Sequence, residues 1–193
     1  ADALLELTLA YRPPFDWPAL VEFLSARAIP GVEVVGAESY RRSFCLDGQA
    51  GVLEIRPVPG RHSLRLRIPA GLANQLPSIT GRVRRLFDLE ADPVAIASDL
   101  GRDPALAPRV RARPGLRVPG AWDGFELAVR AILGQQITVR AATTLSGRLV
   151  REFGPVMRES PPGGPDRLFP PAAVLSEAAL TTGPFTFSRS GDP

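Results

Sequence analysis

The sequence contains no lysine, so all 23 of its basic residues are arginines. Without a lysine ε-amine no side chain can form a Schiff base, which excludes covalent amine catalysis by a side chain. The arginine guanidinium is a planar fork that matches phosphate oxygens well. A codon bias towards arginine explains the same composition, and with a net charge of only +3 the chain is not a basic tail protein.

Cysteine and histidine are limited to one residue each. Cys45 cannot form an internal disulfide, so the sequence does not indicate an oxidising compartment, and we expect Cys45 to be a small buried residue. His62 lies in a predicted turn at a strand edge, where a solvated structural role is expected. A His and Cys metal site needs partners that the sequence lacks, so we expect neither a metal nor a cofactor.

Long hydrophobic runs are also missing. No apolar segment approaches the roughly 18 residues of a membrane helix, and the N-terminus has no secretion-signal pattern. We therefore expect a cytoplasmic protein without a membrane partner. Its 193 residues, 45% hydrophobic and 22% charged, are enough for one large or two small globular domains with a true core.

Alternating apolar and polar residues predict an α+β fold. Leu64, Leu66 and Ile68 oppose Arg65 and Arg67, as in a strand with one dry and one wet face. The same alternation predicts an antiparallel sheet, and we expect helices beside it, the first capped by Asp16. The predicted strands are 3–10, 39–46, 50–56 and 63–68, and two further helices are predicted at 72–87 and 93–100.

Arginines interleaved with prolines between residues 101 and 120 indicate a stiff linker and a domain boundary. We therefore predict a first domain over 1–112 and a second over 113–180. The segment 181–193 has no helical period and little strand alternation, and we expect it to be a disordered or non-native tail.

Two helices are predicted after the linker, over 123–133 and 138–153. Asp123 is the expected cap of the first helix, and Glu126 stands at the third position of a capping box. Gly134 ends this helix and Thr138 caps the next. We expect the first helix to bury an apolar stripe of Phe125, Val129, Ile132 and Leu133.

The stretch FELAVRAILGQQITVRAA, Phe125 to Ala142, resembles the opening helix pair of the helix–hairpin–helix DNA glycosylases, in the DNA-3-methyladenine glycosylase II (AlkA) family. Three further stretches resemble that family in the same order. They are YRPPFDWPALVEFLSARA at 11–28, the run Arg85 to Leu89, and RPGLRVPGAWDGFE at 113–126. The resemblance spans about residues 3–180.

The resemblance implies a TBP-like N-terminal domain, an antiparallel sheet with flanking helices, followed by the incomplete start of an all-α helix–hairpin–helix glycosylase domain. It implies a monomer that binds double-stranded DNA containing alkylated bases, flips out the damaged nucleotide and hydrolyses its glycosidic bond. The family's L-P-G-I-G hairpin and the aspartate after it do not occur in this chain. We therefore expect a truncated, catalytically incomplete chain, and we assign no catalytic residue.

The resemblance also implies roles for single residues. Gln136 fills the hole left by a flipped base, and Gln135 and Thr138 belong to the same DNA-binding turn. The alternative is an ordinary exposed turn between helices. Phe23, Arg27 and Trp17 match substrate-pocket positions. Phe23 is equally explained as a core aromatic, and Arg27 as a side chain that lies along the surface. Trp17 is the weaker pocket candidate, because a core aromatic at the start of the helix explains it better.

Two other functions stay open from the sequence. Besides the glycosylase fragment, the first alternative is a non-catalytic DNA-binding remnant. The second is the glycosylase-like part of an adaptive-response (Ada-type) regulatory fusion. The fusion predicts a cysteine-rich zinc segment and a helix-turn-helix upstream.

Overall fold

The computed structural model describes residues 3–182, and these residues contain one five-stranded antiparallel sheet with the order β1-β5-β4-β3-β2. The four strands predicted from alternation are all present. The additional edge strand, β2, is too short to show an alternating pattern. The strand bounds are β1 (Leu4–Ala10), β2 (Glu33–Gly36), β3 (Ser39–Leu46), β4 (Gln49–Pro57) and β5 (Ser63–Pro69).

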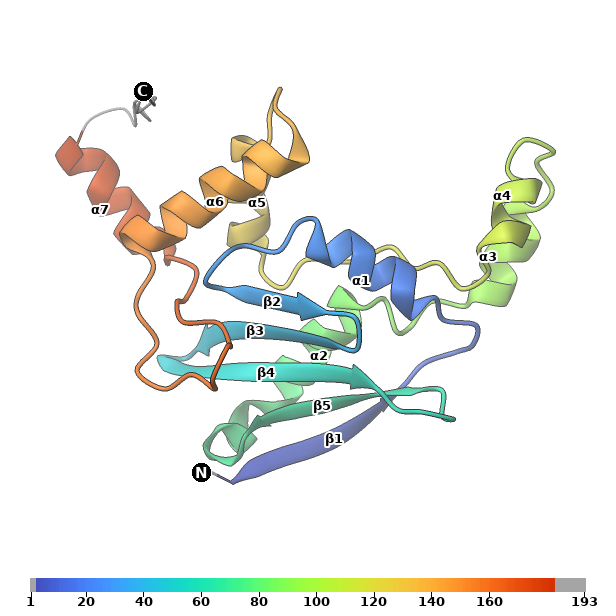
Figure 1. Cartoon of the computed structure of the whole chain (residues 1–193), viewed down its shortest axis with the longest axis horizontal. Helices are drawn as coiled ribbons and strands as arrows, with labels where there is room; N and C mark the ends of the chain where they lie inside the picture. The colour runs from blue at the N-terminus through green and yellow to red at the C-terminus, as the bar shows by residue number, and fades with distance from the viewer. Residues whose placement is uncertain (1–2, 183–193) are drawn as a thin grey trace.

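Helices flank the sheet and extend from two ends of the molecule (Figure 1). The predicted helix at 72–87 is in fact a 3-10 turn followed by a regular helix. Within residues 3–182 no helix is long and apolar enough to cross a membrane. The helical elements are α1 (Trp17–Ser25), η1 (Ala70–Gln75), α2 (Leu76–Leu86), α3 (Pro93–Leu100), α4 (Ala107–Ala112), α5 (Gly124–Leu133), α6 (Val139–Phe153) and α7 (Ala172–Thr182).

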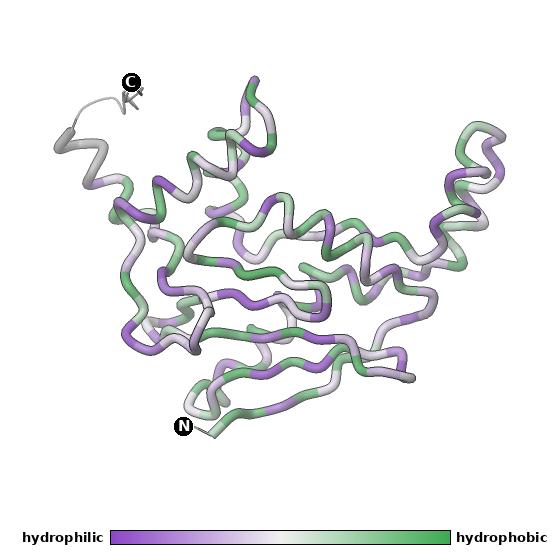
Figure 2. Tube along the Cα trace, viewed as in Figure 1, coloured by the Kyte–Doolittle hydropathy of each residue, from purple (hydrophilic) through white to green (hydrophobic). Residues whose placement is uncertain are grey.

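The main core lies between one face of the sheet and the helices α1 and α2. Leu64, Leu66 and Ile68 point into it, whereas Arg65 and Arg67 point to the opposite face and pair with Glu6 at 2.9 and 2.8 Å. Figure 2 shows the resulting alternation of hydrophilic and hydrophobic residues along the strands. The predicted wet face is therefore confirmed, and Arg65 and Arg67 both have their acidic partner, Glu6, on that face.

The structure corrects the prediction for Cys45, which is exposed rather than buried. Phe44 occupies the neighbouring core position of β3, and because successive side chains of a strand point to opposite faces, Cys45 is directed away from the core. His62 is exposed, as predicted, and its ring centroid lies 6.2 Å from that of Tyr11.

The segment predicted to be a linker is more structured than its proline content suggested. It contains α4, which together with α3 forms a projection at one end of the molecule (Figure 1). Arg117 is buried, and its guanidinium donates hydrogen bonds to the carbonyl oxygens of Asp88, Ala91 and Arg12. These bonds tie the chain at Arg117 to the loop between α2 and α3 and to the segment before α1. The domain division at 112/113 stays a prediction.

The predicted tail at 181–193 falls almost wholly outside the described residues. Only Thr181 and Thr182 are described, and they belong to α7 rather than to a tail.

Candidate nucleic-acid interface

Asp123 fixes the start of α5, as the sequence predicted. Its Oδ1 accepts hydrogen bonds from the amides of Phe125 and Glu126 at 2.9 and 3.1 Å, and Arg82 pairs with its Oδ2 at 3.2 Å. Burial acts to raise the pKa of Asp123, but the amide of Glu126 and the Arg82 guanidinium outweigh it and hold this pKa below its ordinary value. The cap is therefore charged at neutral pH.

The predicted apolar stripe of α5 is wrong, because the helix turns a charged side inwards. Glu126 is 5% exposed, whereas Phe125 is 37% and Ile132 65% exposed. Val129 and Leu133 are half-buried. The Glu126 carboxylate, expected to close the capping box, instead accepts a hydrogen bond from Arg42 of β3 at 2.7 Å. The charge of Arg42 on the sheet, rather than the spacing of apolar residues along the helix, decides which side of α5 faces inwards.

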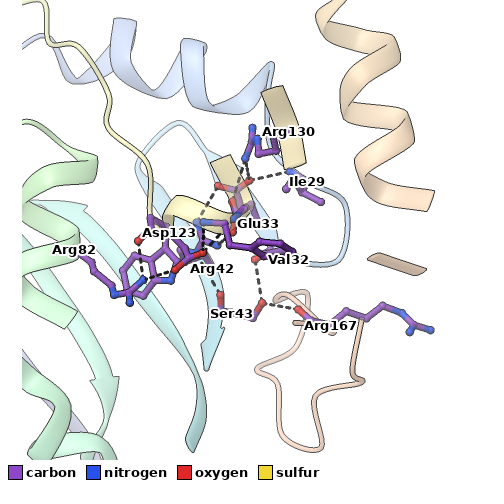
Figure 3. A network of polar contacts seen from close by, with 12 residues as sticks. Ile29, Val32, Glu33, Arg42, Ser43, Arg82, Asp123, Arg130 and Arg167 are labelled. Atoms are coloured by element: carbon purple, nitrogen blue, oxygen red, sulfur yellow. Dashed lines mark hydrogen bonds and ion pairs between the residues drawn. The ribbon is translucent and has the colours of Figure 1, made fainter. Parts of the chain in front are cut away.

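Arg42 is the centre of a buried network of four charges (Figure 3). Besides Glu126 it faces Glu33 of β2, with 3.8 Å between Nη1 and Oε1. Arg130 of α5 bridges the two glutamates at 3.3 Å each. The hydroxyl of Tyr40 donates to Glu33 at 2.5 Å. Two arginines and two glutamates balance, so this network carries no net formal charge.

The electrostatics of the network favour the charged form of Arg42 at all ordinary pH values. Burial alone would lower the pKa of Arg42, but Glu126 and the other oxygen partners raise it well above its usual value. For Tyr40, burial and then the Glu33 carboxylate raise the pKa well above the usual value. Neither Arg42 nor Tyr40 therefore gains or loses a proton near pH 7. The ion pair between Arg42 and Glu126 joins α5 to the sheet.

Sequence reasoning missed this network, although one signal was present. Tyr40 and Phe44 are inward-facing residues of β3, and the alternation of a strand places Arg42 between them on the same face. A buried charge requires a partner of opposite charge, which points to an acidic residue on a facing helix. Glu126 fits this requirement.

The turn between α5 and α6 is short and exposed. Gly134 caps α5 through its amide, which donates to Arg130 O at 2.9 Å, and a Cβ at this position would lie 3.0 Å from that oxygen. Thr138 caps α6 by accepting from the Ala141 amide at 3.2 Å. Gln135 and Gln136 are both exposed, and Gln136 has a φ of +59°.

A left-handed backbone at glutamine is unusual. This conformation costs an ordinary L-residue about 1–2 kcal/mol, and glycine, asparagine and aspartate are its normal occupants. The other two non-glycine residues with positive φ in residues 3–182 are aspartates, Asp47 and Asp88. Glutamine at 136 therefore costs conformational energy that its exposed side chain does not recover by packing.

Of the three predicted pocket residues, the structure brings two together. The Arg27 guanidinium lies over the exposed Phe23 ring, 3.8 Å from its centroid. Arg27 also lines a hollow of about 180 Å³ beside the turn, together with Gly134, Ile137 and Val139 among others. The Arg27 carbonyl oxygen accepts a hydrogen bond from Arg130 at 2.7 Å, which ties the end of α1 to α5.

Trp17 is placed elsewhere. It is buried in the main core, stacks on Phe87 with 5.8 Å between ring centroids, and donates its indole N–H to Ala37 O at 2.9 Å. Trp17 is therefore a core aromatic, the alternative given above, and not a residue of the pocket. The reason is that α1 turns Trp17 towards the sheet and Phe23 away from it.

Three aspartates considered for a hydrolytic site, Asp88, Asp92 and Asp123, are held in a turn and in helix caps. Asp92 caps α3 and pairs with Arg12, and Asp88 has a φ of +50° in the loop before it. Within residues 3–182, no group of three histidine, cysteine, aspartate or glutamate side chains is placed to hold a metal ion.

The chain matches the family model described as AlkA N-terminal domain over residues 6–123. It is 39% identical over 154 residues to the DNA-3-methyladenine glycosylase 2 of Escherichia coli, a match that covers 80% of this chain and 52% of the relative. It is 40% identical over 150 residues to a probable bifunctional transcriptional activator/DNA repair enzyme AlkA of Mycobacterium tuberculosis, covering 78% of this chain and 30% of the relative.

The fold is also similar to a solved structure, the 3-methyladenine DNA-glycosylase of Archaeoglobus fulgidus. The TM-score is 0.75 at 20% identity, with 90% of this chain and 58% of that chain covered. The chain thus spans about half the length or less of the curated relatives it matches. These matches confirm the resemblance predicted from the sequence and the predicted fold class.

Proposed function

The chain belongs to the AlkA N-terminal domain family, and from that premise we propose that it is the DNA-binding part of a base-excision repair glycosylase. The corner formed by α5, the turn at 134–137 and α6 contacts duplex DNA, and Gln136 enters the base stack. The observation that carries this proposal is the exposed Gln136 held in a left-handed backbone conformation. Residues kept in such costly conformations concentrate at functional sites.

An enzyme that acts on a base inside a duplex must first rotate the nucleotide out of the stack. The hole that remains is filled by an inserted side chain, and an inserted residue must project from a rigid support. Gln136 has that support, because α5 ends at Gly134 on one side of it and α6 begins after its cap Thr138 on the other. Its amide can also form hydrogen bonds with the unpaired base of the opposite strand.

Phe23 and Arg27 lie where an extruded base would arrive. A purine methylated at a ring nitrogen carries positive charge, and cations are attracted to the face of an aromatic ring. The Phe23 face is at present covered by the Arg27 guanidinium. An alkylated base would take the place of that guanidinium, which makes alkylated bases of the 3-methyladenine type the preferred substrates.

The name of the Escherichia coli relative supports this substrate class. The reaction is hydrolysis of the bond between base and sugar, in which a carboxylate stabilises the positively charged sugar. We propose that the protein acts as a monomer in the cytoplasm.

The proposal is tested by competition between a duplex with one abasic site and the same duplex without it. The purified chain should prefer the abasic duplex, because the hole is already open for Gln136. Gln136→Ala should reduce that preference, whereas Gln49→Ala, an exposed glutamine of β4, should retain it. No duplex binding, or equal preference in the Gln136→Ala variant, would remove the basis of the proposal.

A second candidate is the glycosylase-like part of a regulatory fusion. The relative from Mycobacterium tuberculosis, at 40% identity, has a name that combines a transcriptional activator with a DNA repair enzyme. The coding sequence upstream decides between the two candidates. A cysteine-rich zinc segment followed by a helix-turn-helix supports the fusion, and an open reading frame that starts without them rejects it.

A further inference from the structure

One side of α6 carries three arginines without an ion-pair partner in the part of the chain that the structure describes. Arg140, Arg148 and Arg151 are exposed, and within residues 3–182 none of them forms an ion pair. At about 100° of rotation per residue they fall on one side of the helix, together with Thr144. We call these three arginines the α6 stripe.

The stripe differs from the arginines of the sheet. Arg65 and Arg67 share Glu6, and Arg56 pairs with Glu54 at 2.8 Å, so each of these arginines has an acidic partner within the fold. The single acidic residue of α6 is Glu152, which lies one turn after Arg148 and forms no ion pair with it. The opposite side of α6 is buried through Ser146, Leu149 and Val150, which fixes the stripe towards solvent.

The position of the stripe points to its ligand. Arg140 follows Gln136 by four residues, so the stripe begins at the corner that faces DNA and runs along α6 away from it (Figure 1). From Arg140 to Arg151 a helix rises about 16 Å. B-DNA carries a negative charge for every 1.7 Å or so of its axis, so a duplex along α6 presents phosphates to all three guanidinium forks.

We propose that the α6 stripe is a second contact surface for the DNA backbone, which holds the duplex beside the Gln136 corner. This inference rests on the proposed function, since it assumes that the corner meets DNA. Phosphate contacts fix register without reading sequence, so the stripe should strengthen binding equally to any duplex. Each phosphate contact adds about 0.9 to the slope of log affinity against log salt concentration.

The test compares two triple variants of the full chain on duplex DNA at several salt concentrations. Arg140→Gln/Arg148→Gln/Arg151→Gln should reduce the salt slope by about 2 to 3 and weaken binding in low salt by tenfold or more. The matched control is Arg109→Gln/Arg111→Gln/Arg113→Gln. It removes the same charge from exposed arginines in and next to α4, at the other end of the molecule (Figure 1), and should retain the slope.

A third variant separates charge from folding. The triple change of the stripe to lysine keeps three cations and should keep most of the slope. If the glutamine triple unfolds, the single change Arg140→Gln should still lower the slope by about 1.

Equal slopes in the stripe and α4 triples overturn the inference and make the stripe a solvated helix face. If Gln136→Ala still loses the abasic preference in that case, the proposed function stands without the stripe. If the unmodified chain binds no duplex, both proposals fail together.

Discussion

At the scale of single residues, this chain has a tightly paired interior and one turn at the surface with a costly backbone conformation. Arg42 and Glu126 are almost fully buried and join α5 to the sheet, whereas Gln136 is exposed and adopts a backbone conformation that glutamine normally avoids. Breaking a buried ion pair on one side leaves the other charge without compensation. The interior is therefore sensitive to single charge changes, and the turn is tolerant of them.

Glu126→Ala should lower the free energy of unfolding by about 3–5 kcal/mol, because Arg42 loses its 2.7 Å partner inside the protein. The double variant Arg42→Met/Glu126→Leu should recover most of this loss, since Glu33 and Arg130 still balance each other. Urea denaturation measures both. Glu54→Gln, which removes a surface partner of Arg56, is the control and should cost about 0–1 kcal/mol. A double variant as unstable as Glu126→Ala contradicts this interpretation.

Gln136→Gly should leave the free energy of unfolding unchanged or raise it by about 1 kcal/mol, because glycine adopts a φ of +59° without steric cost. Gln136→Ala keeps the cost and should be no more stable than the original chain. Thermal unfolding of the two variants checks this. A Gln136→Gly variant that is clearly less stable would mean that the glutamine side chain stabilises the folded turn.

Among the elements, α5 best shows how far the sequence was informative. Its bounds, its Asp123 cap and its end at Gly134 were all predictable, because these depend on local hydrogen bonds and backbone freedom. The side of α5 that faces the sheet was not predictable from the spacing of the helix's own apolar residues. Burial of Glu126 instead of Phe125 depends on Arg42, which lies 84 positions earlier in the chain. The sequence missed α4 and the anchoring of the 101–120 segment for a related reason, since Arg117 donates hydrogen bonds to carbonyl groups of distant segments.

The Asp123 cap gives α5 a defined pH dependence. Asp123→Ala should lower stability at pH 7 by about 1 kcal/mol, the usual value for a cap. Because the pKa of Asp123 is lowered in the folded state, its contribution is complete above the ordinary value of 3.8 and is lost as pH falls through the lower folded value. The two proteins should therefore approach equal stability in strong acid. A difference that widens on acidification is the contrary result.

At the scale of the whole molecule, the sheet, α1 and the α5–α6 corner form one connected support. Arg130 links Glu33, Glu126 and the end of α1, so that Phe23, Arg27 and the turn keep fixed relative positions. This arrangement gives the proposed DNA interface a rigid support. Within the described residues the aspartates Asp16, Asp92 and Asp123 are committed to helix caps.

The purified 193-residue chain should accordingly release no 3-methyladenine from alkylated DNA, while it still binds that DNA. Chromatography of the free base, with a complete glycosylase as positive control, provides the measurement. Base release by the chain without added metal would show that a carboxylate outside these caps performs the reaction.

The central claim is that Gln136 enters the base stack. It is tested most directly with a duplex that contains 2-aminopurine, whose fluorescence is quenched by stacking, next to the nucleotide that is extruded. At saturating protein the unmodified chain should raise the fluorescence, and Gln136→Gly, with its turn intact, should leave it near the level of free DNA. An equal rise with both proteins would contradict the claim, because the stack would then open without the glutamine side chain.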